Sequence, residues 1–119
     1  MREKDLERLR QLLVARRTTM EATIARLQQD LRSSADTSAD PVDHAVSSYE
    51  KHELHQQADQ SRRQLRLLDD ALQRLDAGNY GECAACGNDI AIARLEAIPW
   101  ARYCVTCQEI QEQGTMVKG

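Results

Sequence analysis

The stretch CAACGNDIAIARLEAIPWARYCVTC, residues 83–107, contains every cysteine of the chain. Cys83 and Cys86 form one C-x2-C pair, Cys104 and Cys107 form the other, and seventeen residues separate the two pairs. This spacing is typical of a four-thiolate zinc site, in which each pair turns around one side of a tetrahedral ion. We therefore predict that the four cysteines bind one structural Zn²⁺ ion. No ligand position stays open in such a site, so it would stabilise the fold and catalyse nothing.

Two other uses of the cysteines are considered, a pair of disulfides and a thioredoxin-like redox pair. Disulfides suit a secreted chain, but residues 1–5 (MREKD) lead into a charged segment rather than an apolar signal segment. A redox pair needs a βαβ setting, which the sequence does not suggest. Zinc is favoured for a further reason: Gly87 follows Cys86 and can take the positive φ that turns the backbone over the metal. The thiolate site predicts a cytoplasmic protein.

The composition of the 119 residues favours helices over a large globular core. Phenylalanine is absent, and three tyrosines and one tryptophan are the only aromatic residues, although aromatic side chains supply much of the buried area in a large core. Leucine and alanine dominate the apolar residues instead, which suits the seams between helices. No apolar run approaches the ~20 residues of a membrane span, so we expect a soluble protein.

Leucine periodicity predicts two long helices before the cysteines. In the first, over residues 5–31, the apolar stripe consists of Leu6, Leu9, Leu13, Met20, Ile24, Leu27 and Leu31, with Arg16 as an interruption. In the second, steps of four and three form a heptad seam of Leu54, Ala58, Ser61, Leu65, Leu68, Leu72 and Leu75. A short polar connection joins the two helices, and helices joined in this way return antiparallel.

We therefore predict a mainly α fold, a long antiparallel coiled-coil hairpin over residues 1–78. A zinc-finger module over residues 79–119 follows, with a short final helix over residues 105–113. Asp40 as N-cap and Pro41 at the first helical position mark where the second long helix begins. Gly78 marks its end as the expected left-handed cap. The tip of the hairpin, at about residues 33–45, lies far from the zinc end and is acidic.

The charge distribution argues against a nucleic-acid groove. The net charge is −3, and residues 33–60 alone carry six acidic groups against a single lysine, Lys51. A DNA-binding module usually gathers positive charge on one face. The most concentrated charge here is negative, so we expect no direct sequence-specific DNA binding.

Three stretches resemble the DksA/TraR-type C4 zinc-finger proteins. They are DPVDHA at residues 40–45, GNYGECAACG at residues 78–87 and RLEAIP at residues 94–99. Together they place the match at both ends of the predicted hairpin, and the resemblance covers roughly residues 5–113.

The resemblance implies a partner and a functional tip. Proteins of this family bind RNA polymerase rather than promoter DNA, and their coiled coil enters the secondary channel of the enzyme. By motif position, Asp40, Asp43 and Ala45 would then be the tip residues that approach the active centre. Carboxylates there could perturb the surroundings of the catalytic magnesium, because charge effects are large where water is scarce. The expected outcome is altered promoter-complex stability and initiation, not a covalent reaction, so we expect no enzyme.

One departure from the family pattern concerns guanosine tetraphosphate. DksA-like members use basic side chains near the zinc finger to help form a site for this nucleotide, whereas TraR-like members act without it. Alignment through the cysteines places Leu67, Ile98 and Gln108 at those basic positions. Without three cations a polyphosphate site loses most of its affinity, so we predict that the nucleotide site is missing.

A second hypothesis is a zinc-ribbon adaptor whose hairpin docks on proteins other than RNA polymerase. In that case Asp40 and Asp43 would be no more than the capped start of a helix. The two hypotheses differ in what they predict for Asp43→Asn, which removes activity in the first and changes little in the second. We expect a monomer under either hypothesis, because the hairpin satisfies its own seam.

Overall fold

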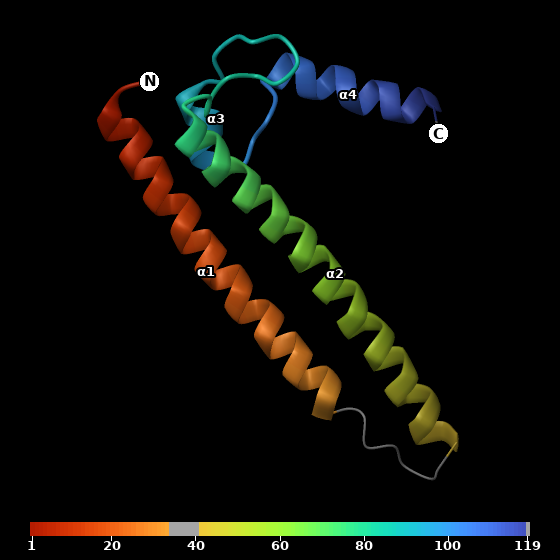
Figure 1. Ribbon diagram of the computed structural model, residues 1–119. Helices are drawn as coiled ribbons and strands as arrows, with labels where there is room; N and C mark the ends of the chain where they lie inside the picture. Colours follow the sequence, from red (N-terminus) through yellow and green to blue (C-terminus); the bar gives the residue numbers. More distant parts are fainter. Residues whose placement is uncertain (34–40, 119) are drawn as a thin grey trace. The chain divides into compact units, whose positions relative to one another are not determined.

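The computed structural model describes the backbone of residues 1–33 and 41–118, and the side chains of residues 1–33 and 48–113. Four helices follow one another along the described chain (Figure 1): α1 (Glu3–Ser33), α2 (Pro41–Ala77), α3 (Ile92–Ala97) and α4 (Val105–Lys118). The two long helices confirm the periodicity-based prediction, with α2 beginning at Pro41 as expected. No helix in the described part of the chain is long and apolar enough to cross a lipid bilayer.

The chain divides into two compact units. One unit contains Met1–Ala15 together with Leu67–Gly119, and the other contains Arg16–Arg66. Each unit therefore includes a piece of α1 and a piece of α2. The domain boundary predicted between residues 78 and 79 coincides with the end of α2, and it stays a prediction about domain organisation.

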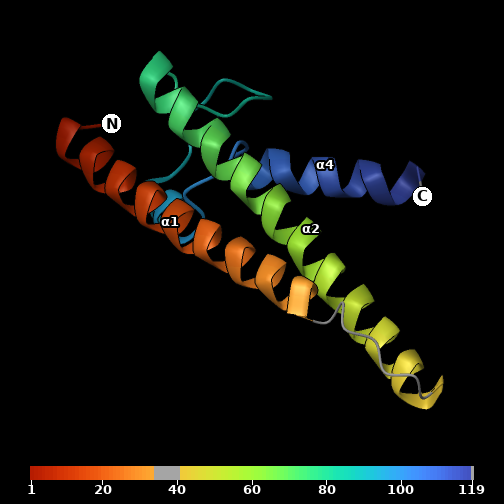
Figure 2. The same ribbon diagram turned by 60° about the horizontal axis from the view of Figure 1, so that its bottom comes forward.

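The first unit brings the beginning of α1 beside the end of α2, which is the antiparallel arrangement expected of a helical hairpin (Figures 1 and 2). Leu9 and Leu13 of α1 and Leu68 of α2 are fully buried there. At the surface, Arg10 forms an ion pair with Asp76 at 3.1 Å. Burial of each leucine side chain contributes about 1.5–3 kcal/mol, so this seam is the main apolar contact between the two helices of the unit.

The second unit has a thinner core. Within its described residues, Leu27 of α1 and Ala58 of α2 are buried, whereas the other predicted seam residues are half-buried. Arg16, which interrupts the leucine stripe, is exposed. Local ion pairs form along each helix of this unit, Arg17 with Glu21 at 3.1 Å in α1 and Arg62 with Asp59 at 3.3 Å in α2. Exposed pairs of this kind contribute little to stability.

The end of α2 is a Schellman motif. The N–H of Asn79 donates to the carbonyl oxygen of Arg74 at 3.0 Å, and the N–H of Gly78 donates to that of Leu75 at 3.2 Å. Gly78 has a φ of 86°, in the left-handed region that a residue without Cβ adopts at least cost. The predicted cap is confirmed, and it turns the chain sharply from α2 into the cysteine-rich region.

Two features of the cysteine-rich region differ from the sequence prediction. The short helix α3 was not expected; it buries Leu95 and lies close to α1, where Arg8 forms an ion pair with Glu96. The final helix was expected over residues 105–113, but α4 continues to Lys118. Both helices belong to the first unit, beside the four cysteines.

Candidate metal centre

The four cysteines form one cluster, as the spacing predicted. The Sγ atoms of Cys83, Cys86, Cys104 and Cys107 all lie within 4.8 Å of one another. The Sγ atoms of Cys86 and Cys104, one from each pair, are 3.9 Å apart. Four sulfurs bound tetrahedrally at ~2.3 Å from zinc would lie about 3.8 Å from one another. The thiols therefore have the spacing that a single four-thiolate Zn²⁺ site requires.

The first cysteine pair is held by a tight turn. The N–H of Gly87 donates to the carbonyl oxygen of Cys83 at 2.9 Å, and the N–H of Cys83 donates to that of Asn88 at 2.8 Å. Gly87 has a φ of 78°, which confirms the positive φ predicted for it. Just outside the turn, Glu82 and Asp89 form an isolated antiparallel bridge. The backbone thus closes into a small loop that directs both thiols to one side.

The second pair lies at the beginning of α4. The N–H of Gln108 donates to the carbonyl oxygen of Cys104 at 2.9 Å, so Cys104 immediately precedes α4 and Cys107 lies in its first turn. A backbone hydrogen bond connects the two pairs: the N–H of Ala84 donates to the carbonyl oxygen of Arg102 at 2.8 Å. This bond holds the turn of the first pair against the segment that leads to the second.

The environment of the thiols favours thiolate at one of them. Burial raises the pKa of Cys83, but backbone N–H groups outweigh burial and lower the pKa to about 6; they belong to Cys104, Cys86 and Ala85. Hydrogen bonds with neighbouring cysteines, Cys104 first, raise the pKa of Cys107 to about 12.

Four thiols this close cannot all ionise without a cation among them. A divalent ion would supply the missing charge, and thiolate donors suit zinc. The site is therefore one for a single structural Zn²⁺ ion.

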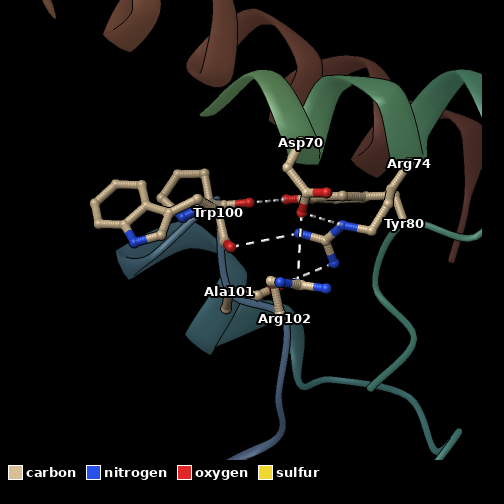
Figure 3. A network of polar contacts seen from close by, with 7 residues as sticks. Asp70, Arg74, Tyr80, Trp100, Ala101 and Arg102 are labelled. Atoms are coloured by element: carbon tan, nitrogen blue, oxygen red, sulfur yellow. Dashed lines mark hydrogen bonds and ion pairs between the residues drawn. The ribbon is translucent and has the colours of Figure 1, made fainter. Parts of the chain in front are cut away.

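A polar network joins the end of α2 to the segment that precedes Cys104 (Figure 3). The Arg74 guanidinium donates to the carbonyl oxygens of Ala101 at 3.3 Å and Trp100 at 3.4 Å. It also pairs with Asp70 at 3.2 Å. Tyr80, which is buried, donates its hydroxyl to the carbonyl oxygen of Pro99 at 2.8 Å. Sequence reasoning did not identify Arg74 or Asp70 as part of the site, because an arginine on a charged helix gives no local sign of its distant acceptors.

The predicted tip residues fall in the part of the chain where little is described. Asp40 lies outside the described residues. Asp43 and Ala45 belong to the first turns of α2, but their side chains lie outside the described residues.

The three positions aligned with the basic residues of the nucleotide site come together in the first unit. Leu67, Ile98 and Gln108 line one pocket of about 390 Å³. Its other lining residues are Arg94, Trp100, Ala101, Arg102, Tyr103 and Glu112. The Nε–H groups of both arginines face partners in the same unit, Arg94 the carbonyl oxygen of Tyr103 at 3.0 Å and Arg102 the Asp70 carboxylate at 3.6 Å.

The chain is similar to known proteins over most of its length. A family profile described as the prokaryotic dksA/traR C4-type zinc finger matches residues 78–113. The RNA polymerase-binding transcription factor DksA of Escherichia coli strain K12 is 30% identical over 112 residues, 94% of this chain and 74% of the relative. The DksA of Haemophilus influenzae is 28% identical over the same length, 94% of this chain and 77% of that protein.

Solved structures give the same result. The transcription factor DksA2 from Pseudomonas aeruginosa matches with a TM-score of 0.90 and 28% identity, over 98% of this chain and 89% of that one. A regulator from Chlamydia trachomatis, with a TM-score of 0.60 and 21% identity over 97% of this chain and 95% of that one, shares the fold. The four-thiol cluster at the end of a helical hairpin, together with this identity over nearly the whole chain, shows that the protein belongs to the DksA/TraR family of C4-type zinc-finger proteins.

Proposed function

We propose that this protein is a transcription regulator that binds RNA polymerase and alters the stability of promoter complexes. The observation that carries the proposal is the 30% identity, over 94% of the chain, to a relative named as an RNA polymerase-binding transcription factor. The TM-score of 0.90 to the solved transcription factor DksA2 supports it over nearly all of the fold. The protein would act in the cytoplasm as a monomer and perform no catalysis of its own.

In this proposal the hairpin tip enters the secondary channel of the polymerase, and Asp40, Asp43 and Ala45 act near its active centre. Two observations support the assignment. The helix α2 begins at Pro41, so Asp43 falls in its first turn. This turn is at the end of α2 that is further from the cysteines along the sequence. The segment from residue 33 to residue 60 also carries the densest negative charge of the chain. A carboxylate brought into a channel with little water would act strongly on nearby cations.

The four cysteines serve this function indirectly. We propose that all four are ligands of one Zn²⁺ ion, which when bound supplies a fixed tetrahedral cross-link. Arg74 and Tyr80 then hold the cysteine-rich region against the end of α2. The hairpin would thus have a rigid base to place against the polymerase.

We further propose that the protein works without a guanosine tetraphosphate site of the DksA type. The proposal is supported by the pocket that Leu67, Ile98 and Gln108 line, because none of these three residues bears a cation. The two arginines of the same pocket, Arg94 and Arg102, already face partners within the fold. A polyphosphate would need free cations in bidentate geometry to bind tightly there.

The test is the lifetime of a ribosomal-type promoter complex with RNA polymerase from the source organism. Wild-type protein and Asp43→Asn are added in parallel, and binding of each to the polymerase is measured separately. We expect wild type to shorten the lifetime, and Asp43→Asn to bind with similar affinity but leave the lifetime unchanged.

Three other results would change the assignment. Binding of wild type to polymerase with no effect on any promoter complex would leave a family member with an inactive tip. No binding at all would favour the adaptor hypothesis, in which the hairpin docks on other proteins. Strongly salt-dependent binding to free DNA would instead indicate a DNA-binding finger.

A further inference from the structure

The irregular segment between α3 and the second cysteine pair is fixed by its carbonyl groups. Five consecutive residues, Pro99 to Tyr103, each offer a carbonyl oxygen that accepts a hydrogen bond. The donors are, in order, the Tyr80 hydroxyl, the Arg74 guanidinium twice, the Ala84 N–H and the Arg94 Nε–H. The segment has no helix or strand of its own, so these donors replace the hydrogen bonds that regular structure would have supplied.

Arg74 is the centre of this arrangement (Figure 3). Its side chain is 13% exposed, and its guanidinium reaches two neighbouring carbonyl oxygens, of Trp100 and Ala101, while it pairs with Asp70. A planar guanidinium suits this task because it spreads its five N–H donors over three nitrogens, whereas an ammonium group would have to contact both carbonyl oxygens and the carboxylate from a single nitrogen. Asp70 also lies 3.6 Å from the Arg102 Nε, so one carboxylate orients Arg74 and contacts the segment that Arg74 holds.

The segment leads directly to the metal ligands. Cys104 follows Tyr103 in the chain, and the carbonyl oxygen of Arg102 accepts the N–H of Ala84, inside the first cysteine pair. The position of the second pair relative to the first therefore depends on the short segment, residues 99–103, that includes the two carbonyl groups bound by Arg74. Groups that orient metal ligands without touching the ion typically change metal affinity 10- to 100-fold when they are removed.

We propose that Arg74, in α2, is a positioning residue of the zinc site. It holds residues 100 and 101 so that the Cys104–Cys107 pair meets the Cys83–Cys86 pair at tetrahedral spacing, and Asp70 and Tyr80 assist it. The proposal concerns the metal site alone and does not depend on whether the protein binds RNA polymerase.

The test compares Arg74→Met with two controls. Methionine keeps an unbranched stem for packing and removes the guanidinium. Arg10→Met removes an arginine of the same unit whose ion pair, with Asp76, does not involve the segment. Leu13→Ala empties a buried core position that offers the segment no polar atom, and so destabilises the same unit by another route.

Two quantities are measured on each full-length variant. Zinc affinity is obtained by competition with a chromogenic chelator, and site geometry is obtained from the visible absorption bands of the Co²⁺-substituted protein, which report tetrahedral thiolate coordination. We expect Arg74→Met to lower zinc affinity about 10- to 100-fold and to alter the Co²⁺ bands. Arg74→Lys should recover part of the affinity, because it keeps the charge beside Asp70 but not the two carbonyl contacts.

The controls separate positioning from general stability. Leu13→Ala should retain the wild-type Co²⁺ bands even where its stability falls, and Arg10→Met should resemble wild type in both quantities. If Arg74→Met fails to fold, Tyr80→Phe removes one donor of the same segment without loss of charge and should weaken zinc binding in the same direction, by a smaller factor. Wild-type Co²⁺ bands and zinc affinity in Arg74→Met, or in Tyr80→Phe where that variant stands in for it, would overturn the proposal.

Discussion

The hydroxyl of Tyr80 donates a hydrogen bond to the carbonyl oxygen of Pro99 at 2.8 Å, across nineteen residues of sequence. The contact is buried, since Tyr80 is only 6% exposed. It connects Tyr80, the second residue after the Gly78 cap of α2, to the start of the segment leading into the second cysteine pair.

Tyr80→Phe should lower the free energy of unfolding by about 0.5–1.5 kcal/mol, because the Pro99 carbonyl loses its buried donor. Unfolding in urea at neutral pH, with zinc bound, measures this. Tyr49→Phe is the matched control, since Tyr49 is 67% exposed and lies in the other unit. An equal loss in both variants would contradict a role for the buried hydrogen bond.

The same tyrosine predicts a pH dependence. Burial raises the pKa of Tyr80 to about 12, and the nearby Arg74 opposes this rise. The pKa in the folded protein is thus above the ordinary value of 10.0 in the unfolded chain, so the contribution of Tyr80 is complete below pH 10 and is lost as the pH rises towards 12. We expect wild type to lose stability over this range more steeply than Tyr80→Phe, in urea unfolding followed as a function of pH. Parallel pH profiles would show that Tyr80 ionises equally easily in both states.

The cap of α2 makes a prediction about backbone conformation alone. Gly78 has a φ of 86°, and an added Cβ would meet nothing within 4 Å. Gly78→Ala should therefore cost about 1 kcal/mol through the strained φ and not through a clash. Gly78→Asn should cost less, because asparagine tolerates the left-handed region. Urea unfolding of both variants tests this, and an equal or larger loss for asparagine would contradict it.

Some elements of the structure could be predicted from the sequence, and others could not. The regular spacing of leucines predicted α1 and α2, because each contact along a helical seam repeats every three or four residues. The spacing of the cysteines predicted the thiol cluster for a similar reason: each pair lies within a single turn. Helix α3 was missed because it spans only six residues, buries Leu95 alone and has no side-chain cap at Ala91.

Arg74 was missed for a different reason. Its acceptors, Trp100 and Ala101, lie 26 and 27 residues further along the chain. They are backbone carbonyl groups, which every residue has, so the residue types in the sequence do not mark them as acceptors. Ala71 is also buried although it is not part of the leucine heptad. Contacts that depend on tertiary packing of backbone groups leave no periodic mark in a sequence.

Zinc binding should release protons and weaken at low pH. The pKa of Cys83 is about 6 and that of Cys107 is about 12, so the metal-free cluster at neutral pH retains at least the proton on Cys107. Zinc must displace that proton, and below pH 6 it must displace the proton of Cys83 as well. Apparent zinc affinity should therefore rise with pH, more steeply below pH 6 than above it. Calorimetry in two buffers of different ionisation enthalpy counts the protons, and a count of zero at pH 7 would contradict the prediction.

The last prediction concerns guanosine tetraphosphate. Lifetimes of promoter complexes in the presence of wild-type protein should be the same with and without the nucleotide, because Leu67, Ile98 and Gln108 give their pocket no cation. The triple variant Leu67→Lys, Ile98→Arg, Gln108→Lys places three cations around that pocket of about 390 Å³. Charge-assisted hydrogen bonds to phosphate contribute about 1.5–3 kcal/mol each, so the variant should acquire a response that wild type lacks.

The control variant Gln56→Lys, Gln57→Arg, Gln60→Lys adds the same number of positive charges at exposed positions of the other unit. It should remain insensitive to the nucleotide, because none of its new cations belongs to the lining of the pocket. A strong response of wild-type protein would show that the nucleotide binds through other residues of the complex. If wild type responds to the nucleotide and the triple variant responds no more strongly, the nucleotide does not act through this pocket.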